Sequence, residues 1–105
     1  MPNSYKNAKV DLTTTGVTVL YTTPSATTTL VKSILVSEDT GNADTITVTI
    51  TDASAAVFSL FKVTAIGANT TVELLTLVVQ ENETLKVTAA TGNRLHVVAS
   101  LLEIN

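Results

Sequence analysis

Threonine alternating with aliphatic residues is the feature that most constrains this chain. From Thr45 to Thr51 every second residue is threonine, and each residue between is isoleucine or valine. Successive side chains of a β-strand point to opposite faces, so this run places aliphatic side chains on one face and hydroxyls on the other. Threonine, valine and isoleucine make up 40 of the 105 residues, and no window has the length and composition of a helix. The sequence therefore predicts an all-β protein.

Turn-forming residues such as Gly16, Pro24, Gly41 and Gly92 divide the chain into short segments. We predict a single antiparallel β-sandwich of about eight strands, jelly-roll-like or immunoglobulin-like. A flexible N-terminal arm is expected over residues 1–7, and the β-sandwich domain over residues 8–105. The expected strands cover residues 9–13, 17–22, 28–37, 45–51, 57–63, 70–75, 84–89 and 94–103.

Period-2 alternation also predicts which residues form the core. The aliphatic side chains of the run 45–51 should be buried, and Thr47 and Thr49 should be exposed or lie at an interface. The whole expected core consists of Val17, Val19, Leu30, Ile34, Val36, Ile46, Val48, Ile50, Phe58, Leu60, Val72, Leu74, Leu85, Val87, Leu95, Val97 and Ala99.

The C-terminal strand is apolar on both faces. One face carries Leu95, Val97, Ala99 and Leu101, and the other carries Val98, Leu102 and Ile104. Either a bulge near Leu101 switches the faces, or both faces are covered. The second interpretation implies contact with a neighbouring subunit.

Charge is scarce and evenly spread. Charged residues make up 14% of the chain, against roughly 25% in typical globular proteins, which suggests that part of the surface meets other protein. The six basic residues form no stripe and the net charge is −3, so we expect no binding to nucleic acid. The longest purely apolar run, residues 55–58, is far shorter than the roughly 20 residues of a membrane span, so we expect no membrane partner.

No residue constellation specifies catalysis. The single histidine, His96, lies in an expected strand without companions for a metal cluster, and it is interpreted as a cross-strand or interface residue. The acidic segment 38–44 could hold calcium through Asp39, Asn42 and Asp44, but it lacks EF-hand spacing and is better interpreted as a solvated hairpin turn. We therefore expect neither enzymatic activity nor a cofactor.

Two stretches resemble small virion proteins of tailed bacteriophages from marine and freshwater sources. The first is Leu20-Tyr21-Thr22-Thr23-Pro24 with the long strand 28–36 after it, and the second comprises 83–90 and 95–104. The resemblance implies a strand that ends in a Leu-Tyr-x-x-Pro corner and a short C-terminal hairpin. It implies a structural virion protein, and it carries over no functional residue.

Three functions are compatible with these observations. We favour a capsid decoration (cement) protein that binds and stabilises the capsid lattice, lies on the outer capsid surface and is made in the cytoplasm of the host bacterium. A tail, neck or fibre-attachment component is the first alternative, and a β-sandwich ligand- or carbohydrate-binding module is the second.

The expected partners are the major capsid protein or another virion protein, and further copies of the chain, as a homotrimer in preference to a dimer. The candidate interface residues are Tyr5, Lys6, Lys9, His96, Val98, Leu102 and Ile104.

Overall fold

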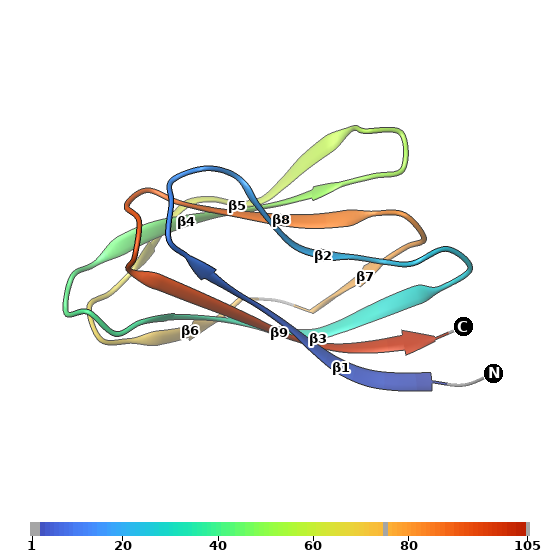
Figure 1. Cartoon of the computed structure of the whole chain (residues 1–105), viewed down its shortest axis with the longest axis horizontal. Coiled ribbons are helices and arrows are strands. Elements are labelled where there is room, and N and C mark those ends of the chain that lie inside the picture. Colours follow the sequence, from blue (N-terminus) through green and yellow to red (C-terminus); the bar gives the residue numbers. More distant parts are fainter. Residues whose placement is uncertain (1–2, 75, 105) are drawn as a thin grey trace.

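A computed structural model describes residues 3–74 and 76–104. The described residues form two stacked antiparallel sheets and no helix, as Figure 1 shows, so the predicted β-sandwich is confirmed. The strands are β1 (Asn3–Leu12), β2 (Thr18–Thr22), β3 (Thr28–Glu38), β4 (Asp44–Thr51), β5 (Val57–Ile66), β6 (Thr71–Glu73), β7 (Leu77–Val79), β8 (Thr84–Ala89) and β9 (Leu95–Ile104). None of the described segments is a helix of the length and apolarity that a membrane crossing requires.

Each sheet is built from strands that are distant in sequence. Sheet A has the order β1-β9-β3, and both β6 and β7 pair with the other side of β3. Sheet B has the order β2-β8-β4-β5. In Figure 1 sheet B is the upper layer and sheet A the lower layer, and the start of β1 and the end of β9 lie at the same end of the sandwich.

The core fills the space between the two sheets, as the alternation predicts. Ile46 and Val48 are fully buried, Ile50 is half-buried, and Thr47 and Thr49 face outward and are half-exposed. The buried aliphatic residues are Leu12, Leu20, Val31, Ile34, Val36, Ile46, Val48, Ile66, Val79, Leu85, Val87, Ala89, Leu95, Val97, Ala99 and Leu101. Leu60, Val72 and Leu74 pack against this cluster and are partly buried.

Two β-bulges overturn part of the predicted core. A register shift between Val31 and Ser33 changes the face that β3 presents, so Val31 is buried and Leu30 lies on the outer face. A second shift, between Val19 and Tyr21, directs Leu20 inward and leaves Val19 54% exposed. Predictions of burial for Val19 and Leu30 were therefore wrong.

Two further core predictions were wrong because the residues lie outside the layered region. Val17 precedes β2, and its side chain is exposed. Phe58 faces Ile50 across the β4–β5 hairpin, where Phe58 is exposed and Ile50 only half-buried. Figure 1 shows that the end of this hairpin rises away from sheet A, which explains why Phe58 is exposed and Ile50 only half-buried.

The N-terminal region differs from the expected arm. Residues 3–7 are the first half of β1 and pair with β9 in a ladder that runs without interruption to Leu12 and Leu95. The strand expected at residues 9–13 thus begins at Asn3. In place of the strand expected at 70–75, the structure has two three-residue strands, β6 and β7, and residue 75 lies outside the described residues.

Candidate interaction surface on sheet A

A row of apolar side chains crosses the outer face of sheet A. Tyr5 of β1 lies opposite Leu102 of β9, which lies opposite Leu30 of β3, which lies opposite Val78 of β7. Directly opposite residues share a face of the sheet, so these four side chains form one continuous row. Tyr5 and Val78, at the two ends of the row, are exposed, and the two leucines between them are half-buried.

A second apolar pair lies on the same face. Val98 lies opposite Leu35, and this pair is flanked by Lys9 on β1 and Glu73 on β6. The small polar residues Asn7, Ser100 and Ser33 separate it from the first row. Ile104 lies beyond the first row, toward the C-terminus, and is 38% exposed. We call the set Tyr5, Leu30, Leu35, Val78, Val98, Leu102 and Ile104 the outer apolar face.

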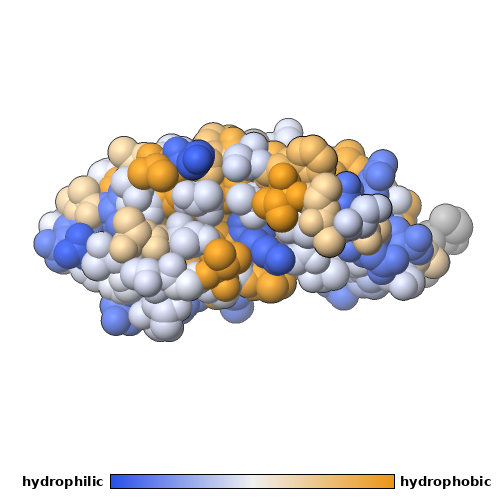
Figure 2. All heavy atoms as spheres, turned by 90° about the horizontal axis from the view of Figure 1, so that it is seen from above, coloured by the Kyte–Doolittle hydropathy of each residue, from blue (hydrophilic) through white to orange (hydrophobic). Residues whose placement is uncertain are grey.

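Sheet B has a different outer surface. Its two central strands carry the threonine rows of β4 and β8, in which Thr47 lies opposite Thr88. Figure 2, which views the molecule from the sheet B side, shows mostly pale, weakly polar side chains with separate groups of apolar ones. Single exposed apolar residues are normal on a protein surface, whereas apolar residues aligned across four strands mark an interaction site. Sheet A is therefore the candidate face.

β9 settles the ambiguity of the C-terminal strand. Leu95, Val97, Ala99, Leu101 and Glu103 are all buried, so the alternation does not switch near Leu101. The bulge at that level lies in β3, at Lys32. The interpretation with a bulge in β9 is therefore wrong, and cover of its outer face by a neighbouring subunit stays a prediction.

One predicted interface residue is engaged within the chain. The Lys6 Nζ atom lies 3.0 Å from the Glu103 Oε1 atom, and Glu103 is only 5% exposed. The hydroxyl of Tyr21 donates to the other oxygen of Glu103 and lies 2.9 Å from the hydroxyl oxygen of Thr29. These contacts connect β1, β9 and β3 of sheet A to β2 of sheet B. Lys6 thus faces the interior side of β1, away from Tyr5 and Lys9.

This network perturbs two acid groups. The hydrogen bond from Tyr21, opposed in part by burial and assisted by Lys6, lowers the pKa of Glu103. Burial, together with the hydrogen bond to Glu103 and its negative charge, raises the pKa of Tyr21. Glu103 is therefore held as a carboxylate and Tyr21 as a neutral donor, which suits a structural clamp between the sheets.

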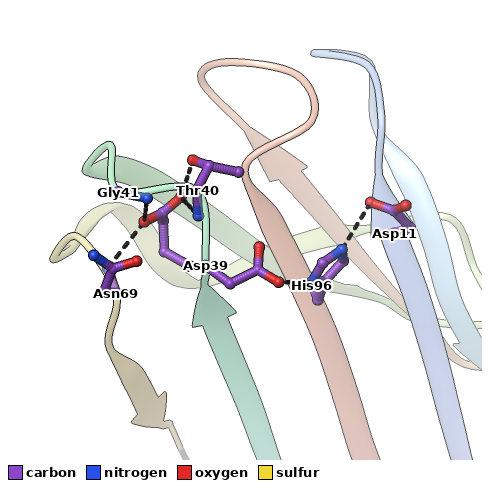
Figure 3. A network of polar contacts seen from close by, with 7 residues as sticks. Asp11, Asp39, Thr40, Gly41, Asn69 and His96 are labelled. Carbon is purple, nitrogen blue, oxygen red and sulfur yellow. Dashed lines mark hydrogen bonds and ion pairs between the residues drawn. The ribbon is translucent and has the colours of Figure 1, made fainter.

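His96 lies at the end of the outer face opposite to Ile104. Its Nε2 atom is 3.4 Å from Asp11 Oδ1 and its Nδ1 atom 3.8 Å from Asp39 Oδ2, as Figure 3 shows. Asp11 lies directly opposite on β1, and Asp39 follows the end of β3. His96 thus has a partner across the β1–β9 pair, and its role at an interface stays a prediction.

The acidic turn between β3 and β4 is organised around Glu38. This buried carboxylate accepts hydrogen bonds from the backbone N–H groups of Thr40 (2.8 Å), Gly41 (3.1 Å), Asn42 (3.2 Å) and Asn69 (2.9 Å), and from the Thr40 hydroxyl. Figure 3 shows the donors converging from two turns. Burial raises the pKa of Glu38, but the hydrogen bonds from Thr40, Asn69 and Gly41 outweigh burial and lower it to about 2.

The three candidate calcium ligands each contact a different partner. Asp44 is buried and accepts from the N–H groups of Thr45 and Thr91, Asp39 lies beside His96, and the Asn42 amide donates to the Thr40 carbonyl. Within residues 3–74 and 76–104 no three acidic, histidine or cysteine side chains are grouped to hold a metal ion. The turn is a structural element in which Glu38, which the sequence did not single out, is the central residue.

Six of the seven predicted interface residues share one face of sheet A. Tyr5, Lys9, Val98, Leu102, Ile104 and His96 lie on its outer side, and Lys6 does not. Leu30, Leu35 and Val78, which complete the outer apolar face, were not predicted as interface residues. The signal was the unbroken apolar character of Ile34, Leu35 and Val36, which indicates a strand apolar on both faces, like β9.

Two comparisons with known proteins give no match: no family model and no curated protein sequence is similar to the chain. Two solved structures share the fold. A chain from the structure of Bacillus endospore appendages, a novel family of disulfide-linked pili, has a TM-score of 0.61 at 10% identity, covering 98% of this chain and 88% of that chain. A chain from the acid-stable capsid of Helicobacter pylori bacteriophage KHP30 has a TM-score of 0.59 at 14% identity, covering 98% of this chain and 93% of that chain. At these identities the likeness concerns the fold alone.

Proposed function

We propose that this chain is a non-enzymatic structural protein of a bacteriophage virion, and that it decorates and stabilises the capsid lattice from the outside. The observation that carries the proposal is the outer apolar face of sheet A. Its rows are aligned across strands, its end residues are exposed, and the charged side chains beside them are Lys9, Lys32 and Glu73. Such a face gains stability when another protein covers it.

The scarcity of charge supports the same role. A decorating subunit remains in contact with a lattice, so its surface has to lose water over a broad area. Hydroxyl groups cost less to desolvate than charges do, because they find hydrogen-bond partners in the interface. The threonine-covered strands of sheet B and the apolar face of sheet A both satisfy this requirement, and the net charge of −3 disfavours contact with packaged DNA.

The two structural neighbours support an assembling protein, since one comes from a phage capsid and the other from a pilus. The 105 residues contain no cysteine, so linkage through disulfides, as described for the endospore appendages, has no basis in this chain. That difference favours the virion role.

We propose the major capsid protein and further copies of the chain as partners, and the capsid exterior of particles assembled in the bacterial cytoplasm as the location.

Copy number tests the proposal and separates it from a tail, neck or fibre-attachment role. Purified particles of the phage that encodes the chain would be analysed by quantitative mass spectrometry against their major capsid protein. A decoration protein is expected in hundreds of copies, in a simple ratio to the capsid lattice. A few copies per particle would identify a tail or neck component, and absence from purified particles would overturn the virion role.

A further inference from the structure

We propose that β1 is a docking edge for a second copy of this chain, and that the two β1 strands pair antiparallel about Ala8 to join the two copies of sheet A into one continuous sheet. The proposal deepens the structural role proposed above by naming the self-contact. It can be tested on the purified protein alone, so its failure is distinguishable from failure of the virion role.

The first support is a comparison of the sheet edges in the described residues. β5 is interrupted by two bulges against β4, and Val63 within it has a φ of 49°, which a β-branched residue rarely adopts. β2 is bulged at Leu20, and β6 and β7 are three residues long each. Bulges and short strands are the usual means of protecting an edge from pairing.

β1 has none of these protections. It runs for ten residues in uninterrupted register with β9, contains no proline, and every residue from Asn3 to Asn7 is exposed. Its one inward-facing charge, Lys6, is paired with Glu103, so a neighbouring strand would not force an unpaired ammonium group out of water. A regular and open edge of this length is a template for β-strand addition.

The charge pattern of β1 is compatible with a second copy as the partner. If a two-fold axis passes through Ala8, each residue of one β1 faces a residue of the other β1, and the two residue numbers add up to 16. Lys9 then faces Asn7 of the partner subunit, Asp11 faces Tyr5 of the partner subunit, and Lys6 faces Val10 of the partner subunit. No two like charges are directly opposite, whereas an axis at Lys9 would place two lysines face to face. The half-buried Ala8 and Val10 gain cover on the inner side.

The same geometry favours a dimer over the trimer expected from the sequence. A ring of three through sheet extension needs two different open edges on each copy, and among the described strands β1 alone is open and regular. The two-fold pair would also place both outer apolar faces on one continuous sheet, doubling the area that a lattice can cover.

Substitutions at Asn7 test the pairing, because Asn7 lies opposite Ser100 within the chain and carries no charge. Sedimentation of the wild type from low to high micromolar concentration is expected to show a monomer–dimer equilibrium. Asn7→Lys places a lysine opposite Lys9 of the partner subunit and is expected to weaken the dimer at least tenfold, whereas Asn7→Glu is expected to strengthen it. Thermal unfolding would verify that both variants fold.

Engineered cysteines provide an independent measurement, since the chain has no native thiol. Ala8→Cys is expected to form a disulfide-linked dimer on mild oxidation, because the two sulfurs would meet on the axis. Val19→Cys, on the bulged edge strand β2, is the matched control and is expected to remain monomeric. A wild type that stays monomeric at several hundred micromolar, an unaffected dimer in Asn7→Lys, or equal cross-linking of both cysteine variants would overturn the proposal.

Discussion

The ammonium group of Lys6 lies 3.0 Å from the carboxylate of Glu103, which is almost fully buried at the end of the sandwich. Lys6 belongs to the edge strand β1, and Glu103 also accepts the hydroxyl of Tyr21 from the opposite sheet. One carboxylate thereby fastens the edge of sheet A to sheet B. This attachment adds to the backbone ladder with β9 that holds the first half of β1 in the sheet.

Tyr21→Phe is expected to lower the free energy of unfolding by about 1–3 kcal/mol, because Glu103 and Thr29 lose a buried hydrogen-bond partner. Chemical denaturation at neutral pH measures the change. Tyr5→Phe is the matched control: Tyr5 is 76% exposed, and the same removal of a hydroxyl is expected to leave stability within about 0.5 kcal/mol of the wild type. Equal effects of the two substitutions would contradict the role given to the Tyr21 hydroxyl.

The Glu38 carboxylate makes stability sensitive to acid. Its pKa is lowered from 4.5 to about 2 in the folded protein, so the folded state favours the charged form. The resulting stabilisation is fully present above pH 4.5 and is lost as the pH falls toward 2. Denaturation curves from pH 7 to pH 2 are expected to show a steeper acid decline for the wild type than for Glu38→Gln. Parallel curves would show that another group dominates the acid transition.

Gly92→Ala is expected to destabilise the fold, because an added methyl carbon would lie 2.6 Å from the backbone carbonyl oxygen of Thr13. Relieving that overlap requires movement of the turn between β8 and β9 or of the segment after β1, at a cost of about 1–3 kcal/mol. Gly16→Ala is the control, since its nearest contact would be an ordinary 3.7 Å. Thermal unfolding is expected to show a lower Tm for Gly92→Ala only.

Period-2 alternation predicted the parts of the fold where strands are regular. Ile46, Val48, Leu85 and Val87 are buried because β4 and β8 pair with each other in unbroken register. Leu30 and Val19 were placed on the wrong face because a bulge adds one residue to a strand and reverses every side chain beyond it. Lys32 and Leu20, at these bulges, carry no sequence signal for the irregularity.

Regular alternation also predicted part of the candidate surface. Val98, Leu102 and Ile104 were identified because β9 is apolar in both phases of its alternation. Leu30 was missed because of the bulge at Lys32, and Val78 was missed because its place depends on which strands become neighbours in sheet A, which long-range pairing decides. The Glu38 network was missed because its donors come from two turns, 31 residues apart in the case of Asn69.

The most direct test of the central claim compares particle binding by two double variants. Val98→Lys with Leu102→Lys alters the outer apolar face, and Val17→Lys with Val19→Lys alters exposed valines near the edge of sheet B. The pairs are matched, because the new lysine at position 98 lies opposite Lys9 and the one at position 19 opposite Lys86. Each folded variant would be added to particles of the encoding phage that lack the protein, and bound protein would be counted after sedimentation. Loss of binding for the sheet A variant alone, by at least tenfold, is the predicted result, and normal binding of that variant would contradict the claim that the outer apolar face attaches the protein to the capsid.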